Sequence, residues 1–530
     1  MKFKKFLPLL LVFPLSGCLF NKTLEIPTVD VESIKINLPA LPSGRNSGAP
    51  RSSDGYDYID LYELSDFHGA VNYEPDHSSG TYVGLSKLAT YFEGKRALNP
   101  GGTVILSTGD MFQGSAESNL TRGYMVNYSM QYMGFDAMAL GNHEFDWTDS
   151  WLKKNAELKY NTSTIPYLGA NILKDGATPD FLRKSTIITR GDYKIGVIGV
   201  IGNELETTIM KSCLEGYEFV KYAPIVEAEA QILRNDMDCN AVVLLAHEAA
   251  DKIEPLTSYC VDAVFGGHAH KDIPSSAAGA TAPSLSTKNY GQSVAHITLK
   301  FDSATKEIVH GGATSEIEQM VNVASGLKED ANINNIMGQY AESIDKIKNI
   351  KLGRATEELS HEKALKNICT TKMHEAAVAS ASSLNIDSNK IIAAYHNING
   401  GIRDDIAKGK ITYGSVYKAF PFDNEIVLMK VSGRDFISYC KQLNNLAIYR
   451  TFESKASLNE NEDYYIVLTD FLAFSEYFQD FKLNGEDIQD KDLIRTGKIV
   501  RDEVAQKIYD IRTVKNSKWD TNDMCYRYVS

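Results

Sequence analysis

Five short stretches of this 530-residue chain combine histidine with aspartate, asparagine or glutamate in metal-ligating patterns. They are Ser65-Asp66-Phe67-His68, Gly109-Asp110, Gly141-Asn142-His143-Glu144, Ala246-His247-Glu248 and Gly267-His268-Ala269-His270. Carboxylate and amide oxygens mixed with imidazole nitrogens suit zinc, manganese, cobalt or iron, whereas an all-oxygen set would favour magnesium or calcium. No Cys-x-x-Cys pair occurs. The motifs therefore predict a hydrolase site with two divalent metal ions, in which the Asp110 carboxylate bridges ions about 3.5–4 Å apart.

Each motif follows a strand-like run. Residues 58–64 alternate apolar and polar side chains, and four short runs are rich in Val, Ile, Leu and Phe, at 103–106, 137–140, 241–245 and 261–265. Such apolar runs are typical of strands buried in a sheet. Because an open α/β sheet gathers the carboxyl ends of its strands at one edge, we expect all five motifs to meet there.

The ordered series D-x-H, G-D, G-N-H-E, single H and G-H-x-H resembles the calcineurin-like metallophosphoesterases, and within them the two-domain bacterial 5'-nucleotidases. This resemblance implies an α/β protein with an N-terminal αββα sandwich, a linker helix and a C-terminal α/β nucleotidase domain. It also implies two ligand sets, one made by Asp66, His68, Asp110 and His270 and the other by Asp110, Asn142, His247 and His268.

The resemblance leaves His143 as a catalytic residue near the leaving oxygen, with Asp146 orienting it, while a metal-activated water attacks phosphorus. Six other histidines lack comparable context and are interpreted as structural, namely His77, His296, His310, His361, His374 and His396.

The N-terminus predicts an extracytoplasmic protein. Lys2, Lys4 and Lys5 precede an apolar run at 6–15 that is too short to span a bilayer, and Leu15-Ser16-Gly17-Cys18 follows. The last four residues resemble a bacterial lipobox, so residues 1–18 are predicted to be a lipoprotein signal peptide whose Cys18 is lipidated and anchors the protein to the cell envelope. An ordinary secretory signal with a chance cysteine is the alternative. The proline-containing segment 19–55 is typical of a flexible tether.

The chain is long enough for two domains, which we place at 56–322 and 351–530 with a linker helix at 323–350. The helix itself is indicated by apolar residues at helical spacings across 324–348. Apart from Cys18 there are six cysteines, an even number that permits disulfides in an exported protein without revealing their connectivity.

The C-terminal half contains the motif Asn399-Gly400-Gly401-Ile402-Arg403. Glycines allow close approach of the backbone to a ligand, and an arginine fork can bind phosphate through paired hydrogen bonds. By resemblance, Arg403 contacts the substrate phosphate, and Phe422 and Phe471 sandwich a nucleobase. The chain departs from its relatives at residues 474–478, which lack the expected glycines and aspartate, at residues 359–367, which lack an arginine, and at Ile398, where Asn is common.

These observations predict a 5'-nucleotidase that releases phosphate from extracytoplasmic nucleotides. Two alternatives remain open: a hydrolase of the same fold that acts on cyclic nucleotides, nucleotide sugars or sulfur esters, and a non-catalytic nucleotide-binding or adhesin-like surface lipoprotein. The formal net charge of −13 makes long nucleic acid an unsuitable partner because like charges repel.

Overall fold

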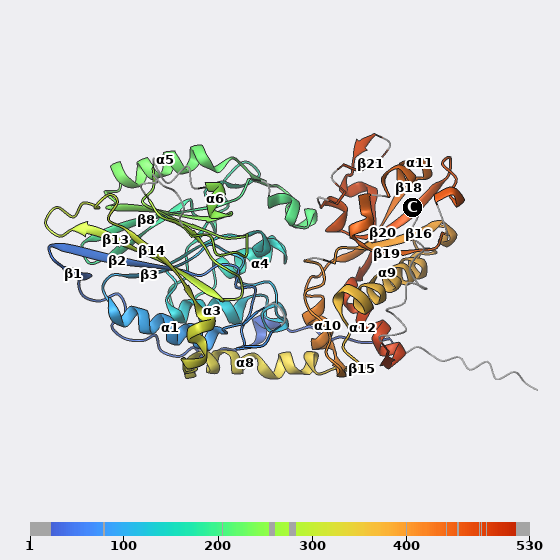
Figure 1. Ribbon diagram of the computed structural model, residues 1–530, viewed down its shortest axis with the longest axis horizontal. Helices are drawn as coiled ribbons and strands as arrows, with labels where there is room; N and C mark the ends of the chain where they lie inside the picture. Colours follow the sequence, from blue (N-terminus) through green and yellow to red (C-terminus); the bar gives the residue numbers. More distant parts are fainter. Residues whose placement is uncertain are drawn as a thin grey trace, which may run out of the picture.

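The computed structural model describes residues 23–77, 80–203, 205–253, 260–274, 282–398, 400–440, 442–452, 455–475, 477–478, 480–483 and 485–515. Two α/β bodies lie side by side, and the long helix α8 (Ala331–Lys348) runs beneath them (Figure 1). The predicted signal peptide with Cys18, and Asn399 of the predicted substrate loop, lie outside the described residues.

The N-terminal body contains two sheets packed face to face. The first contains β14 (Thr314–Gln319), β13 (Ser293–Asp302), β2 (Tyr56–Glu63), β3 (Thr103–Ser107), β4 (Ala137–Ala139) and β5 (Tyr167–Leu168) in that order, with β1 (Arg51–Ser53) paired to β2. The second contains β12 (Ser284–Ser286), β11 (Ala263–Gly266), β10 (Ala241–His247), β8 (Tyr193–Ile201) and β7 (Ser185–Arg190). Apolar side chains from both sheets, among them Leu61 and Phe265, form the core between them.

Helices cover the outer faces of this pair of sheets. Figure 1 shows α5 (Tyr222–Asn235) and α6 (Ala250–Ile253) on one side and α1 (Leu85–Leu98) and α3 (Tyr124–Met133) on the other. The predicted αββα sandwich is therefore confirmed. The shorter elements of this body are α2 (Ala116–Leu120), α4 (Asp149–Ala156), α7 (Met320–Val323) and the hairpin of β6 (Ile172–Lys174) and β9 (Tyr217–Phe219).

Strand direction explains why distant motifs converge. β2, β3, β4 and β5 pair in parallel, and so do β8, β10, β11 and β12. Every residue of β3, β4, β10 and β11 is buried, as expected for strands covered on both faces. The polar motifs leave the carboxyl ends of β2, β3, β4, β10 and β11, so they reach one common edge.

Helix α8 contacts both bodies. Four of its apolar side chains, Ile333, Ile336, Tyr340 and Ile344, pack in the N-terminal cluster, whereas Ile347 packs in the C-terminal cluster. The helix begins seven residues later than the start predicted at 324, because the Asp330 carboxylate caps it by accepting from the backbone N–H groups of Asn332 and Ile333.

The C-terminal body is built on a five-stranded sheet. Its order is β19 (Ala447–Arg450), β16 (Ile391–His396), β20 (Asp463–Thr469), β18 (Glu425–Ser432) and β23 (Leu493–Ile499). The helices are α9 (Lys366–Ser380), α10 (Tyr413–Ala419), α11 (Gly433–Tyr439) and α12 (Val500–Ile511), and two small sheets complete the body: β17 (Gly409–Thr412) with β15 (Lys351–Ala355) and β24 (Thr513–Val514), and β21 (Lys482–Leu483) with β22 (Glu486–Asp487).

The segment 23–50 differs from the flexible tether predicted over 19–55. Leu24 and Ile26 pack against the C-terminal cluster, Val31 is buried in the N-terminal cluster, and Val29 contacts both. The backbone N–H of Leu24 donates to the Oε1 atom of Gln506 on α12 at 2.7 Å. Alternating apolar residues give this proline-containing stretch an inward face, so its described part lies as a strap across the two bodies.

None of the described helices is long and apolar enough to cross a membrane. Cys213, Cys239, Cys369 and Cys440 form no disulfide. The disulfides that the even number of cysteines permits are therefore not formed by these four residues.

Candidate metal centre and interdomain cavity

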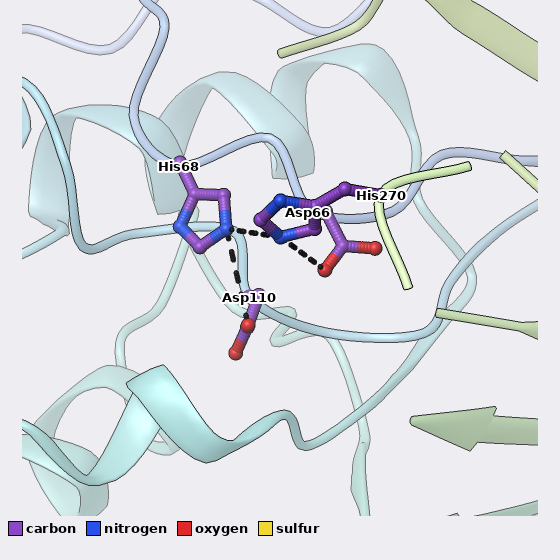
Figure 2. Close-up of side chains that lie close together, drawn as sticks. All are labelled: Asp66, His68, Asp110 and His270. Atoms are coloured by element: carbon purple, nitrogen blue, oxygen red, sulfur yellow. Dashed lines mark hydrogen bonds and ion pairs between the residues drawn. The ribbon is translucent and has the colours of Figure 1, made fainter. Parts of the chain in front are cut away.

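The first group of potential ligands lies at the carboxyl edge of the first sheet. Asp66, His68, Asp110 and His270 each direct a ligand atom to one point, with these atoms within 4.8 Å of one another. Figure 2 shows the imidazole rings of His68 and His270 beside each other above the Asp110 carboxylate, and their Nε2 atoms lie 3.0 Å apart. His270 Nε2 lies 3.3 Å from Asp66 Oδ1, and His68 Nε2 lies 3.9 Å from Asp110 Oδ2.

The second group shares Asp110 with the first. His247 and His268 complete a cluster with the Asp110 carboxylate, and the Asn142 Oδ1 atom lies 3.0 Å from His247 Nε2 and 3.2 Å from His268 Nδ1. The two groups coincide residue by residue with the two ligand sets that the family resemblance implies. The structure thus brings all seven predicted ligands together, and their role as ligands remains a prediction.

Hydrogen bonds on the far side of each ring orient the histidines. His68 Nδ1 lies 3.0 Å from the Gln113 carbonyl oxygen, and His247 Nδ1 lies 2.8 Å from that of Thr108. A carbonyl oxygen only accepts, so each Nδ1 carries a proton, which leaves Nε2 as the ring nitrogen directed at the centre. A metal ligand at Nε2 requires its proton at Nδ1, so this arrangement suits both residues as ligands.

Glu144 holds the loop of Asp110. Its buried carboxylate accepts hydrogen bonds from the backbone N–H groups of Asp110 at 2.7 Å, Met111 at 2.8 Å and Gly141 at 2.8 Å. The loops after β3 and β4 are thereby joined. This role of Glu144 was not predicted from the sequence, although its position directly after His143 was a signal for one.

The electrostatics of the centre fit a cation. Burial would raise the pKa of the Asp110 carboxyl, but the nearby His247 and His143 hold it well below its ordinary value. Burial lowers the pKa of His68 well below its ordinary value and lowers that of His268 to about 4, so both rings are neutral at pH 7. Among the described residues, the ion pairs of the buried Asp66 and Asp110 involve only histidines. Divalent cations would balance this negative charge with the oxygen and nitrogen donors that they prefer.

Five of the seven predicted ligands have left-handed backbone conformations. The φ angles are 48° at Asp66, 47° at His68, 54° at Asp110, 64° at His268 and 53° at His270. Non-glycine residues adopt this region infrequently, although Asp, Asn and His are enriched there. These loops turn sharply as they leave the strands, which directs the side chains back over the edge of the sheet.

His143 lies beside the two groups without joining them. Its Nδ1 atom lies 2.8 Å from Asp146 Oδ2, and its backbone N–H donates to Asp110 Oδ1 at 2.8 Å. Burial disfavours the charged imidazole, but Asp146 and Asp110 outweigh it and raise the pKa of His143. This geometry agrees with the predicted pair of a proton-donating His143 and an orienting Asp146, whose catalytic roles stay predictions.

One cavity of about 320 Å³ joins the candidate metal centre to the C-terminal body. Its lining includes Asp110, Asn142, His143, His268 and His270 from the first body, and Gly400, Gly401, Arg403, Phe422 and Phe471 from the second. The Phe422 ring lies 5.7 Å from the His143 ring, centre to centre, and the Arg403 guanidinium lies 5.2 Å from the centre of the Phe422 ring. All described residues of the predicted substrate site therefore line the same cavity as the predicted catalytic residue.

Several other residues that line this cavity were not predicted from the sequence. Trp147 and Met210 line it from the first body, and Asn424 and Tyr477 from the second. Trp147 lies one residue beyond Asp146, which was the available signal, whereas Met210 and Tyr477 belong to loops whose course the sequence pattern does not reveal.

Comparison with known families and proteins agrees with this architecture. Residues 61–272 match the model of the calcineurin-like phosphoesterases, and residues 343–438 match that of the 5'-nucleotidase C-terminal domain. The chain is 24% identical over 409 residues to the endonuclease YhcR of Bacillus subtilis, covering 71% of this chain and 32% of that protein. It is 27% identical over 385 residues to an apyrase of Aedes albopictus, covering 66% of this chain and 64% of that protein. The chain thus spans less than two thirds of the length of these two relatives.

A solved structure, that of a 5'-nucleotidase precursor from Thermus thermophilus, superposes with a TM-score of 0.68 at 18% identity, covering 86% of this chain and 97% of that one. At this identity the likeness establishes the fold. With both family models matched in order and a group of candidate metal ligands at the sheet edge, the chain contains a calcineurin-like phosphoesterase domain followed by a 5'-nucleotidase C-terminal domain.

Proposed function

We propose that this phosphoesterase is a 5'-nucleotidase that hydrolyses the 5'-phosphate ester of nucleotides outside the cytoplasm. The cavity described above carries this proposal, because a nucleotide has a doubly charged phosphate at one end and a flat aromatic base at the other. The cavity has polar ligand groups on one side and the rings of Phe422 and Phe471 on the other. These features match the two ends of the substrate.

Asp66, His68, Asp110 and His270 would hold one divalent cation, and Asp110, Asn142, His247 and His268 the other. When bound, such cations supply positive charge that neutralises phosphoryl oxygens and lowers the pKa of water. We propose zinc, manganese, cobalt or iron as the cations, on the basis of the mixed nitrogen and oxygen donors.

His143 and Arg403 would act on the substrate directly. The bond between His143 Nδ1 and Asp146 leaves Nε2 as the atom that can donate a proton to the leaving 5'-oxygen. Asp146 holds the ring in place and favours its protonated form. The Nε–H of Arg403 donates to the Gly400 carbonyl at 2.8 Å, which fixes the guanidinium fork at the cavity wall, where its remaining N–H groups can bind phosphate oxygens.

Base recognition would depend on stacking. Ring stacking contributes about 1–3 kcal/mol per base and tolerates many bases. Residues 474–478 lack the glycines and the aspartate expected of relatives, so we propose a broad preference among purine and pyrimidine nucleotides.

The test is a substrate panel with manganese, cobalt and zinc, run on the wild type and on Phe422→Ala and Phe471→Ala. We expect AMP hydrolysis, and in each variant a KM for AMP raised about tenfold, with a smaller change for an aryl phosphate. Phe474→Ala is the matched control, because Phe474 lies near Phe471 in sequence but not in the cavity lining. Stoichiometric metal binding with no turnover of any phosphoester would contradict the proposal. If a cyclic nucleotide, a nucleotide sugar or a sulfur ester were hydrolysed faster than AMP, that compound would be assigned as the substrate in place of AMP.

We also propose that the protein is anchored to the outside of a bacterial membrane through Cys18. The support is the basic N-terminus, the short apolar run and the Leu-Ser-Gly-Cys sequence. Labelling with a radioactive fatty acid should mark the wild type, and Cys18→Ser should abolish the label and release the protein from the membrane fraction. Labelling of the Cys18→Ser variant would refute this assignment.

A further inference from the structure

A short segment of the first body contacts the loop of the second body that carries Phe422. Asn119, at 2% exposure, donates from Nδ2 to the Pro421 carbonyl oxygen at 2.9 Å. Three residues further on, Arg122 Nη1 lies 3.2 Å from Asp423 Oδ2. These two contacts flank Phe422 on either side and hold its backbone against the first body.

The same asparagine is connected to the metal centre. Its Oδ1 atom accepts a hydrogen bond from the Gly114 backbone N–H at 2.7 Å. The preceding residue, Gln113, orients His68 through its carbonyl oxygen, and the backbone N–H of Ser115 donates to the His68 carbonyl at 3.3 Å. One side chain amide therefore bridges the loop of a predicted ligand and the loop of a predicted base-stacking ring.

We propose that Asn119 is a positioning residue that holds Phe422 opposite His143 and so sets the distance between the phosphate and base subsites. This inference rests on the proposed function in taking Phe422 as a base-stacking ring. An amide is suited to the task because it offers one donor and one acceptor at the same time. Loss of the donor would leave the Pro421 carbonyl without this partner and let the loop move away from the metal centre.

Another polar contact between the two bodies provides a control. Lys418 on α10 contacts Glu74 of the first body at 2.9 Å and Asp404 of its own body at 3.2 Å, and both carboxylates lie outside the Phe422 loop. If Asn119 acted only by holding the two bodies together, removing the Lys418 contact would change substrate binding to a similar extent as removing the Asn119 contact. If Asn119 positions Phe422, only a substitution of Asn119 should weaken the binding of a nucleotide.

The decisive variant is Asn119→Asp. It has nearly the same shape and keeps the acceptor for Gly114, but it presents an acceptor instead of a donor to the Pro421 carbonyl. We expect KM for AMP to rise about tenfold, with kcat at saturation within about twofold of the wild type. The kcat/KM for a ring-free ester, β-glycerol phosphate, should stay within about twofold, since it does not use the ring. Amide hydrogen exchange of residues 422–425 should accelerate about tenfold, whereas Lys418→Met should leave all four quantities within about twofold.

The proposal is overturned if Asn119→Asp leaves exchange at 422–425 unchanged, if Lys418→Met has an equal effect, or if both esters are affected equally. If Asn119→Asp fails to fold, Arg122→Met provides the test. It should raise KM for AMP about two- to threefold without the same effect on β-glycerol phosphate, because the Arg122–Asp423 ion pair is partly exposed. A wild type that does not bind nucleotides would refute the proposed function, and the exchange comparison would still test whether Asn119 positions the loop.

Discussion

Arg501 of α12 is the residue whose removal should most disturb the Phe422 loop. It is 5% exposed, and its Nη1 lies 3.4, 3.2 and 3.2 Å from the carbonyl oxygens of Phe420, Pro421 and Phe422, respectively. Its Nη2 pairs with the Asp423 carboxylate, and the guanidinium lies 3.9 Å from the centre of the Tyr417 ring. Burial disfavours the charge of Asp423, but Arg501 and then Arg122 lower its pKa, which keeps it ionised.

The expected loss of stability follows from the burial of Arg501. In Arg501→Met the Asp423 carboxylate loses its buried partner and three carbonyls lose a donor, and removal of one member of a buried pair typically destabilises by about 3–5 kcal/mol. Asp423 keeps 28% side-chain exposure and its second arginine, so we take the lower end, about 3 kcal/mol. Arg122→Met removes the other arginine from the same carboxylate. Its side chain is 34% exposed, and a pair of this kind contributes about 0.2–1 kcal/mol.

Native-state hydrogen exchange of α12 is the assay, because a two-domain chain has no single free energy of unfolding. A loss of about 3 kcal/mol corresponds to exchange about 150-fold faster in Arg501→Met, against at most about fivefold in Arg122→Met. Exchange within about threefold of wild type in Arg501→Met, or equal acceleration in both variants, would refute the reasoning from burial.

Three further changes have defined outcomes. His143→Asn should retain both metals, measured by elemental analysis, while kcat falls about 10²–10⁴-fold, and an unchanged kcat would remove His143 from catalysis. His296 pairs with Asp60 at 3.1 Å and with Glu316 at 2.9 Å. Burial opposes the charge of His296, but these two partners raise its pKa. The contribution of this charge to the stability of the fold is therefore full below the ordinary histidine pKa of about 6.5 and is lost as pH rises through the raised pKa of the folded state. Thermal denaturation should thus show a larger deficit of His296→Gln at about pH 6 than at about pH 9, and an equal deficit at both would exclude this linkage. Leu24→Asp combined with Ile26→Asp should release the strap and increase proteolysis between the two bodies, whereas the exposed-site control Thr23→Asp should not.

The proximity of the seven predicted ligands could be inferred from the sequence because its signals are local. Each ligand stands within a few residues of a buried strand, and parallel strands deliver their carboxyl ends to one edge. Asp110 could be assigned to both groups by family resemblance before any distance was known. The structure then brings its carboxylate to the shared position.

The contacts that hold the Phe422 loop could not be predicted in this way. Arg501 and Asp423 lie on different elements of the C-terminal body, and Asn119 and Pro421 on different bodies, so no periodicity connects them. The strap was misjudged for a different reason. Its prolines are typical of linkers, but the alternation of Leu24 and Ile26 with exposed Thr23 and Glu25 was a strand-like signal of an inward face.

The left-handed backbone conformations at the predicted ligand positions lower the stability of the folded chain. Glycine would relax the main chain at Asp66 or His68, by about 1 kcal/mol or more at each position, but it would delete a predicted ligand atom. Thermal stability and the predicted cation binding therefore favour different residues at the same positions. A stabilising redesign should accordingly leave these turns alone and draw its gains from surfaces remote from the sheet edge.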